Sequence, residues 1–402
     1  MKKMKKYYFL AAGLLLMLGS CSQDDIVEAN LGADEIRFAA VTNGSTRAAD
    51  IYNPTNMPAS FQVSAMSQGK VYISDDKIER KGSEAPYTWE NSTGTRYWPE
   101  DAVDFYAHFN AGGTFQLNNG APTFDNFSVA SAVGSQVDLL YAVKKGQTKP
   151  ETDTPVKLNF RHALSQIVFQ ARNESENIFV QIKGVKVMNV TGSGTYTFPT
   201  ADTDDNLPET DSPDQPATTR GSWDLTDTKA GYEVDFSLKD VNGKKGATNA
   251  DAVNLTDEKG TALMLMPQTT KAWVPTDYAA PDAAENANSY LLVDCVIYNV
   301  SGEGSDLPGD NVCLWGTELK QGDVVVGYTT KELAIPVKFD WTEGHKYTYT
   351  LVFGNGNGGY DPDPENPDKP EPVLVPISFE VTVDEFLDGG NYDVESPDEL
   401  GQ

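Results

Sequence analysis

Apolar and polar residues alternate in short segments along most of the chain, which is the pattern of strands that bury one face. Clear examples are Phe61, Val63 and Ala65, and no long stretch repeats apolar residues at the spacing of an amphipathic helix. Gly, Asn, Asp and Pro separate these segments. The pattern therefore predicts an all-β fold built from β-sandwiches.

A polar segment with two prolines, residues 147–155, divides this pattern into two parts. Segments of that composition are typical of the exposed linkers between domains. The chain has 402 residues, which is enough for two units that each bury a core. We predict an N-terminal sandwich over residues 48–152 and a C-terminal sandwich over residues 153–402.

The first twenty residues have the composition of an export signal. Four lysines precede a short apolar stretch, residues 7–18, which is too short to span a bilayer. Small residues then precede Cys21, as in bacterial lipoproteins whose cysteine is acylated. The alternative is an ordinary signal peptide that happens to contain a cysteine. We predict a signal peptide over residues 1–20 and a lipid on Cys21 that anchors the chain to the outer membrane.

Charge and motif content reduce the number of possible function classes. The 59 acidic residues exceed the 31 basic ones, for a net charge of −28, which argues against binding nucleic acid. The sequence lacks G-x-S-x-G, H-E-x-x-H and C-x-x-C, and its three histidines are isolated. Two acidic segments, residues 199–220 and 361–372, have oxygen ligands for calcium but not the spacing of an EF-hand. We expect no enzymatic activity, no cofactor and no metal.

Cys295 and Cys313 lie on either side of a turn-rich segment, residues 301–308, between two predicted strands. Hairpin pairing would place the two cysteines opposite one another, and disulfides persist in exported proteins. The other interpretation is two buried thiols that pack as small apolar residues. The sequence leaves both open.

Several segments, in this order and spacing, resemble the fimbrillin family, in its Mfa-like group of type V pilus subunits. They are residues 18–21, 36–38, 46–48, 97–99, 103–107, 138–142, 156–167, 344–351 and 376–381. The resemblance implies two transthyretin-like β-sandwich domains in tandem. It also implies export to the cell surface, cleavage by an arginine-specific protease near the mature N-terminus, and polymerisation by strand exchange once the first strand is removed.

The residues at the N-terminus fit these implications. Ile36, Phe38 and Ala40 alternate with polar or small neighbours, so this segment forms a half-buried strand. Its removal would expose an apolar trench and unpaired backbone groups. Residues 43–50 are small and polar, as an accessible cleavage loop should be. We expect cleavage between Arg47 and Ala48, which makes residues 21–47 a propeptide.

The C-terminal segment contains a candidate donor strand. Ile377, Phe379, Val381 and Val383 alternate with polar residues within residues 373–387, after a proline-rich segment. The other interpretation is that this strand completes its own domain.

We therefore expect a structural subunit of a cell-surface fimbria that supports adhesion to a host or bacterial surface ligand. The shaft is favoured, because a cleavable arginine argues against a permanent anchor and a donor strand argues against a tip. The alternatives are a tip adhesin of the same pilus and a monomeric surface glycan-binding lipoprotein. The expected partners are other pilus subunits and an arginine-specific maturation protease. The expected location is the outer membrane, through the lipid, and then the fimbrium.

Overall fold

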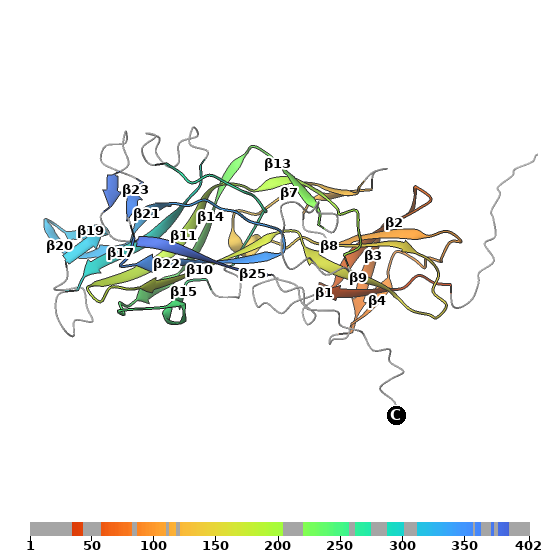
Figure 1. Cartoon of the computed structure of the whole chain (residues 1–402), viewed down its shortest axis with the longest axis horizontal. Helices are drawn as coiled ribbons and strands as arrows, with labels where there is room; N and C mark the ends of the chain where they lie inside the picture. Colours follow the sequence, from red (N-terminus) through yellow and green to blue (C-terminus); the bar gives the residue numbers. More distant parts are fainter. Residues whose placement is uncertain are drawn as a thin grey trace, which may run out of the picture.

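The computed structural model describes residues 34–42, 58–82, 87–109, 112–117, 121–203, 220–256, 262–274, 288–300, 312–356, 358–362, 371–373 and 377–385. Strands run through all parts of these ranges (Figure 1), so the prediction of an all-β fold is confirmed. The helices in the described ranges are two short 3₁₀ turns, Val133–Ser135 and Asn249–Asp251. None of the described helices is long and apolar enough to cross a membrane.

Seven strands form the N-terminal sheet, in the spatial order β1-β9-β8-β5-β2-β3-β4. They are β1 (Phe38–Thr42), β2 (Ser60–Ser67), β3 (Lys70–Lys81), β4 (Thr88–Asn91), β5 (Val103–His108), β8 (Leu140–Gln147) and β9 (Val156–His162). Phe61 and Val63 alternate into its core as the sequence predicts. The two ends of the sheet meet, because Glu35 before β1 forms a bridge with Tyr97 beyond β4. The sheet therefore curls round its own apolar cluster.

Two sheets face each other in the C-terminal half. One contains β15 (Val253–Asn254), β10 (Ser165–Asn173), β22 (His345–Phe353) and β25 (Ile377–Glu385), with β16 (Leu263–Leu265) also paired to β10. The other contains β14 (Lys229–Val241), β11 (Ile178–Thr191), β17 (Tyr290–Asn299), β21 (Lys331–Pro336), β23 (Gly359–Asp361) and β24 (Glu371–Val373), with β18 (Val312–Trp315) paired to β17. Phe169 and Leu351 from the first sheet share one buried cluster with Val185 and Leu291 from the second. This half is a β-sandwich.

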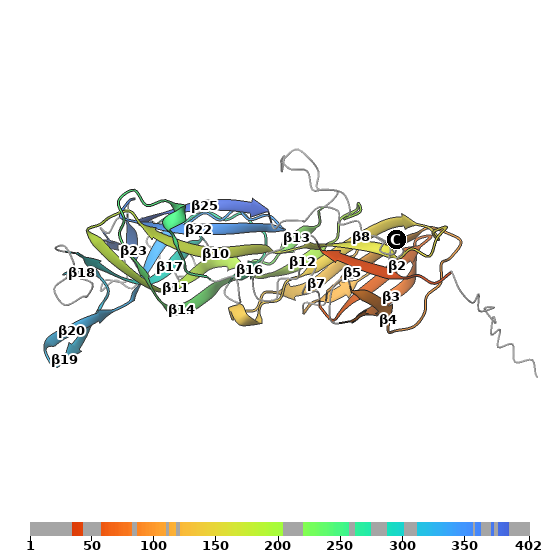
Figure 2. The same cartoon turned by 90° about the horizontal axis from the view of Figure 1, so that it is seen from below.

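A four-stranded sheet lies between the two halves (Figure 2). Its strands, in the order β13-β12-β7-β6, are β13 (Ser222–Leu225), β12 (Ser193–Thr197), β7 (Thr123–Ser128) and β6 (Thr114–Gln116). At the far end of the sandwich, β19 (Thr317–Gln321) and β20 (Val324–Thr329) form a hairpin that projects from it (Figure 2). The middle sheet combines strands from both halves of the sequence, so the halves are joined by strand pairing as well as by the chain.

The chain passes from the N-terminal sheet to the sandwich at Ala163 and Leu164. Strand β9 pairs with β1 and β8, whereas β10, which begins two residues later, pairs with β22. Val156 and Leu158 on β9 point into the N-terminal cluster. The passage therefore lies one strand later than the proline-containing segment near residue 150, where the sequence analysis places the boundary.

Candidate functional site

Strand β1 pairs with β9 in parallel, with Phe38 opposite Val156. The Val156 N–H donates to the Arg37 carbonyl at 2.7 Å, and on the other side the Ile36 N–H donates to the Arg96 carbonyl at 2.8 Å. Every other pairing along the order of this sheet is antiparallel. Strand β1 thus fills the gap between the two ends of the curled sheet.

The inner face of β1, together with Ile36 just before it, completes the N-terminal core. Ile36 is 2% exposed and Phe38 is 5% exposed, while Ala40 is partly buried against the same cluster. The rings of Phe38 and Phe105 meet edge to face with their centroids 5.5 Å apart, a favourable aromatic geometry. Burial of a side chain of this size contributes roughly 1.5–3 kcal/mol. The strand predicted to be removable is therefore one whose loss uncovers the core.

The outer face of β1 contributes much less. Arg37 forms an ion pair with Asp153, in which the two side chains are 44% and 58% exposed. Lys149 forms a second pair with Asp34, just before the strand. Solvent-exposed pairs of this kind contribute at most about 1 kcal/mol each. Apolar burial and backbone hydrogen bonds, rather than charge, hold β1 in place.

Removal of β1 would create a groove that can bind an extended strand. The freed edge of β9 would present unpaired N–H and C=O groups, and the spaces left by Ile36 and Phe38 would be apolar. No other strand pairing in the sheet involves β1, because β1 is the terminal strand of the order. A groove of this kind selects a strand by main-chain pairing and by the size of alternate side chains.

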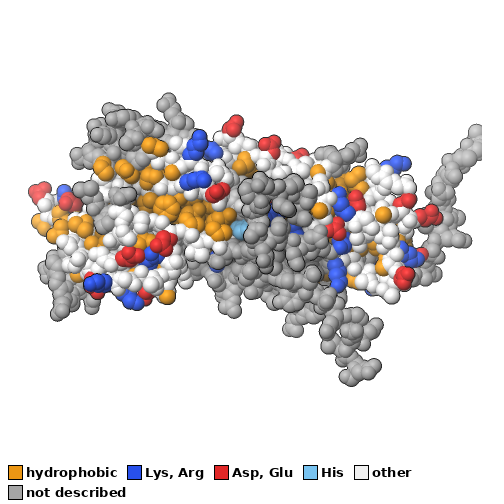
Figure 3. Space-filling model, in the orientation of Figure 1, with side chains coloured by type: hydrophobic (Ala, Val, Ile, Leu, Met, Phe, Trp, Pro, Cys, Tyr) orange, Lys and Arg blue, Asp and Glu red, His pale blue; other side chains and the backbone are white. Residues whose placement is uncertain are grey.

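Strand β25 carries all four residues of the candidate donor. It pairs with β22 in antiparallel over nine residue pairs and is the last strand of its own sheet. Its inner row is unevenly buried: Ile377 is 2% exposed and Phe379 is partly buried, but Val381 and Val383 are 41% and 52% exposed. A run of hydrophobic side chains is visible on this half of the molecule (Figure 3). The second half of β25 therefore adds little to its own core.

The residues predicted for lipidation and cleavage, Cys21, Arg47 and Ala48, lie outside the described residues. The described strands nevertheless lie on both sides of Arg47 in the sequence, since β1 ends at Thr42 and β2 begins at Ser60. A cut after Arg47 would separate β1 from the rest of the chain.

Cys295 and Cys313 are free thiols on the neighbouring strands β17 and β18. Cys313 lies opposite Tyr298 in the pairing of these strands, three residues along β17 from Cys295. The hairpin pairing that would place the two cysteines opposite one another is therefore not the pairing of β17 and β18 in the structure. Burial raises the pKa of both thiols, which keeps them protonated and poorly reactive.

A buried carboxyl group that the sequence analysis does not single out lies where the two halves meet. Glu343 accepts hydrogen bonds from the hydroxyl of Tyr141 on β8, at 2.9 Å, and of Tyr196 on β12, at 3.0 Å. Burial raises the pKa of Glu343 to about 7, although both hydroxyls and the charges of Arg220 and Arg161 oppose this rise. Glu343 therefore ties the segment before β22 to the N-terminal and middle sheets.

Two buried histidine contacts also connect segments within the described residues. The Nδ1 atom of His162 lies 2.5 Å from Asp138 Oδ2, and both side chains are buried. His108 stacks on Phe115 with the ring centroids 4.7 Å apart. In the part of the chain that the structure describes, no three His, Cys, Asp or Glu side chains come together as a metal site.

Comparison with known proteins identifies the family of this chain. The fimbrillin-like family matches the chain over residues 46–366, which is most of its length. The chain belongs to the fimbrillin-like family, and the resemblance drawn from its motifs is confirmed. No curated protein matches the chain.

Solved structures of low sequence identity are similar over most of their length. One is a fimbrial protein from Bacteroides vulgatus ATCC 8482, with 16% identity, a TM-score of 0.49, and coverage of 87% of this chain and 99% of that one. Another is a candidate cell adhesion protein from Parabacteroides distasonis ATCC 8503, with 10% identity, a TM-score of 0.45, and coverage of 88% and 99%. A third is a candidate cell adhesion protein from Bacteroides eggerthii DSM 20697, with 12% identity, a TM-score of 0.42, and coverage of 90% and 99%.

Proposed function

We propose that this chain is a structural subunit in the shaft of a cell-surface fimbria, that it assembles by protease-triggered strand exchange, and that it supports adhesion. Membership of the fimbrillin-like family supports a surface location and contacts with other pilus subunits. The observation that carries the proposal is the position of strand β1 in the N-terminal sheet. The strand closes the N-terminal sheet, buries Ile36 and Phe38, and can leave without disturbing any other pairing of that sheet.

A single cleavage would have two effects. Before it, a lipid on Cys21 holds the precursor at the outer membrane while β1 occupies its groove. An arginine-specific protease then cuts between Arg47 and Ala48, in the segment that joins β1 to β2. Strand β1 is then held by non-covalent contacts alone. These are its backbone hydrogen bonds with β9 and residues 96–98, its packing on the N-terminal core and two exposed ion pairs. Because Cys21 lies on the same side of the cut as β1, loss of the cleaved segment opens the groove and releases the subunit from its lipid.

Strand β25 of a second subunit has apolar side chains of a suitable size and spacing to occupy the emptied groove. The segment that contains β1 presents Ile36, just before the strand, and Phe38 two residues later, followed by a small apolar residue. Strand β25 presents Ile377 and Phe379 at the same spacing, followed by Val381. Inserted parallel to β9, it would place Ile377 and Phe379 in the spaces of Ile36 and Phe38. Val381, which is exposed on its own sheet, would gain an apolar environment.

Treatment of the purified precursor with an arginine-specific protease tests this function. We expect a new N-terminus at Ala48, followed by a ladder of oligomers on size-exclusion chromatography. Arg47→Lys is the matched control, since it keeps the charge but is not a substrate of such a protease. It should stay monomeric.

Two results would count against the proposal. A protein that is cut before Ala48 and stays monomeric would contradict assembly by strand exchange. A wild-type precursor that remains uncut and monomeric would favour a monomeric glycan-binding lipoprotein instead.

A further inference from the structure

Apolar burial holds only the first half of β25 on its own sheet. The strand pairs with β22 along its whole length, but of its inner residues only Ile377 is fully buried, at 2% exposure. Val381 and Val383, further along, are 41% and 52% exposed. Since stabilisation by burial scales with the apolar area removed from water, residues 381–383 are weakly held.

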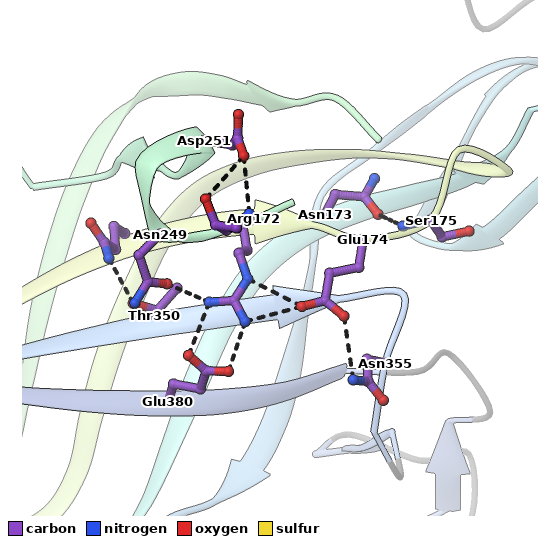
Figure 4. A network of polar contacts seen from close by, with 11 residues as sticks. Arg172, Asn173, Glu174, Ser175, Asn249, Asp251, Thr350, Asn355 and Glu380 are labelled. Carbon is purple, nitrogen blue, oxygen red and sulfur yellow. Dashed lines mark hydrogen bonds and ion pairs between the residues drawn. The ribbon is translucent and has the colours of Figure 1, made fainter. Parts of the chain in front are cut away.

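Glu380 lies at the boundary between these two halves and makes a two-point ion pair. Arg172 donates from Nη2 to Glu380 Oε1 at 2.7 Å and from Nη1 to Oε2 at 3.1 Å. Arg172 belongs to β10, and β22 lies between β10 and β25, so the pair reaches across a whole strand (Figure 4). Among the side chains of β25 that the structure describes, residues 377–383, Glu380 alone bonds to another strand through a polar group.

The guanidinium of Arg172 is held in position by groups outside β25. Its Nε and Nη2 atoms donate to Glu174 Oε1 at 3.2 and 3.0 Å, and its Nη1 atom also donates to Asn249 (Figure 4). Its side chain is 7% exposed, whereas that of Glu380 is 52% exposed. Arg172 is therefore a preorganised cation beside the edge of β22, and the carboxylate approaches it from the solvent side.

We propose that Arg172 is a latch that keeps β25 on its own sheet until assembly and fixes its register there. A slip of one residue would turn Glu380 to the opposite face of the sheet and break the pair. Opening begins at the weakly held residues 381–383, continues through the Arg172–Glu380 pair and ends at Ile377. Glu174 and Asn249 keep their contacts with Arg172 when the pair breaks, so opening does not leave a buried cation without partners.

Hydrogen exchange in the uncleaved monomer tests the latch directly. Glu380→Gln keeps the size of the side chain and removes its charge, and the amides of residues 377–385 should then exchange about threefold faster or more. Thr382→Gln lies on the same outer row of β25 and should leave the exchange rate unchanged. In an Arg172→Gln background, Glu380→Gln should add no further effect, because the partner is already absent. Equal amide exchange rates in Glu380→Gln and the wild type would overturn the latch. So would an increase in exchange rate by Thr382→Gln equal to that by Glu380→Gln.

The role of the latch in assembly rests on the proposed function, and polymerisation after cleavage separates the two. Faster exchange and faster polymerisation of Glu380→Gln would support both. Faster exchange with no polymer from any cleaved variant would support the latch and overturn strand exchange. Unchanged exchange with polymers that form at the wild-type rate would overturn the latch and support strand exchange.

Discussion

At the scale of single residues, Phe38 helps to retain β1, because its ring is buried against Phe105. Phe38→Ala would leave a cavity in the N-terminal core. We expect the uncleaved chain to lose about 3 kcal/mol of its free energy of unfolding, as measured in urea. Arg37→Ala, one residue away on the exposed face, should cost less than about 1 kcal/mol.

Phe38→Ala should affect the stability of the precursor but not that of the mature protein. Residue 38 is discarded with β1 under the proposed function, so cleaved Phe38→Ala should form polymers as stable as those of the wild type. A loss of stability equal to that of Arg37→Ala would show that the core does not depend on β1.

Glu343 makes the stability of the fold depend on pH. A glutamate side chain ordinarily has a pKa of 4.5, and that of Glu343 in the folded chain is about 7. The folded chain therefore holds this proton more tightly than the unfolded chain does. Its contribution to stability is complete below pH 4.5, falls as the pH rises, and is lost above about pH 7. A change of this size corresponds to about 3 kcal/mol.

Glu343→Gln tests this dependence. The amide can accept a hydrogen bond from one of the two tyrosines, Tyr141 and Tyr196, and donate one to the other, but it cannot ionise. We expect the wild-type chain to lose about 3 kcal/mol relative to Glu343→Gln between pH 4.5 and pH 8, measured by urea unfolding at both values. A constant difference between the two proteins across this range would contradict the raised pKa.

At the scale of elements, the proposal requires one strand to fit two environments. Val381 is exposed on its own sheet but would become buried in the groove of a second subunit. Val381→Asp should therefore change the stability of the monomer by less than about 0.5 kcal/mol. It should abolish polymerisation after cleavage, because an unpaired carboxylate would be buried in the groove.

Thr382→Asp is the matched control for this variant. It adds the same charge one residue further along, on the face that points away from the groove. Cleaved Thr382→Asp should polymerise, as judged by size-exclusion chromatography. Equal loss of polymers from both variants would indicate general charge repulsion, and equal retention would exclude β25 as the donor.

The sequence predicts the individual strands well and their partners poorly. The alternation at Phe61 and Val63 is local, so the sequence alone is enough to recognise β2. The Tyr141–Glu343 contact joins residues 202 positions apart, and no local pattern marks it. The relative position of Cys295 and Cys313 depends on the register in which β17 pairs with β18, which hydrophobic alternation does not reveal.

The same limit applies to the candidate site. The alternation of Ile36, Phe38 and Ala40 is enough to predict a half-buried strand. Its parallel pairing with β9, and the bridge between Glu35 and Tyr97 that closes the sheet, are long-range contacts that only the structure gives. The sequence therefore indicates which residues could leave, and the structure indicates what their departure would expose.

At the scale of the whole molecule, charge opposes association except at specific sites. With a net charge of −28, two copies repel each other over most of their surfaces. The inner row of β25 and the groove beneath β1 are apolar, so contact between them buries apolar area without facing like charges. The donor and the groove are different surfaces of one chain. Such a contact extends into a filament when the rotation between successive copies does not close into a ring.

A mixture of two variants that are blocked at opposite sites tests this polarity. Arg47→Lys keeps its groove filled but can donate β25, whereas cleaved Val381→Asp has an open groove but cannot donate. Each should be monomeric alone, and their mixture should form dimers with one copy of each chain and no longer species, as measured by native mass spectrometry. Longer oligomers would show a second mode of association. A mixture that stays monomeric would show that β25 does not enter the groove left by β1, because the mixture contains both an intact β25, on Arg47→Lys, and an open groove, on cleaved Val381→Asp.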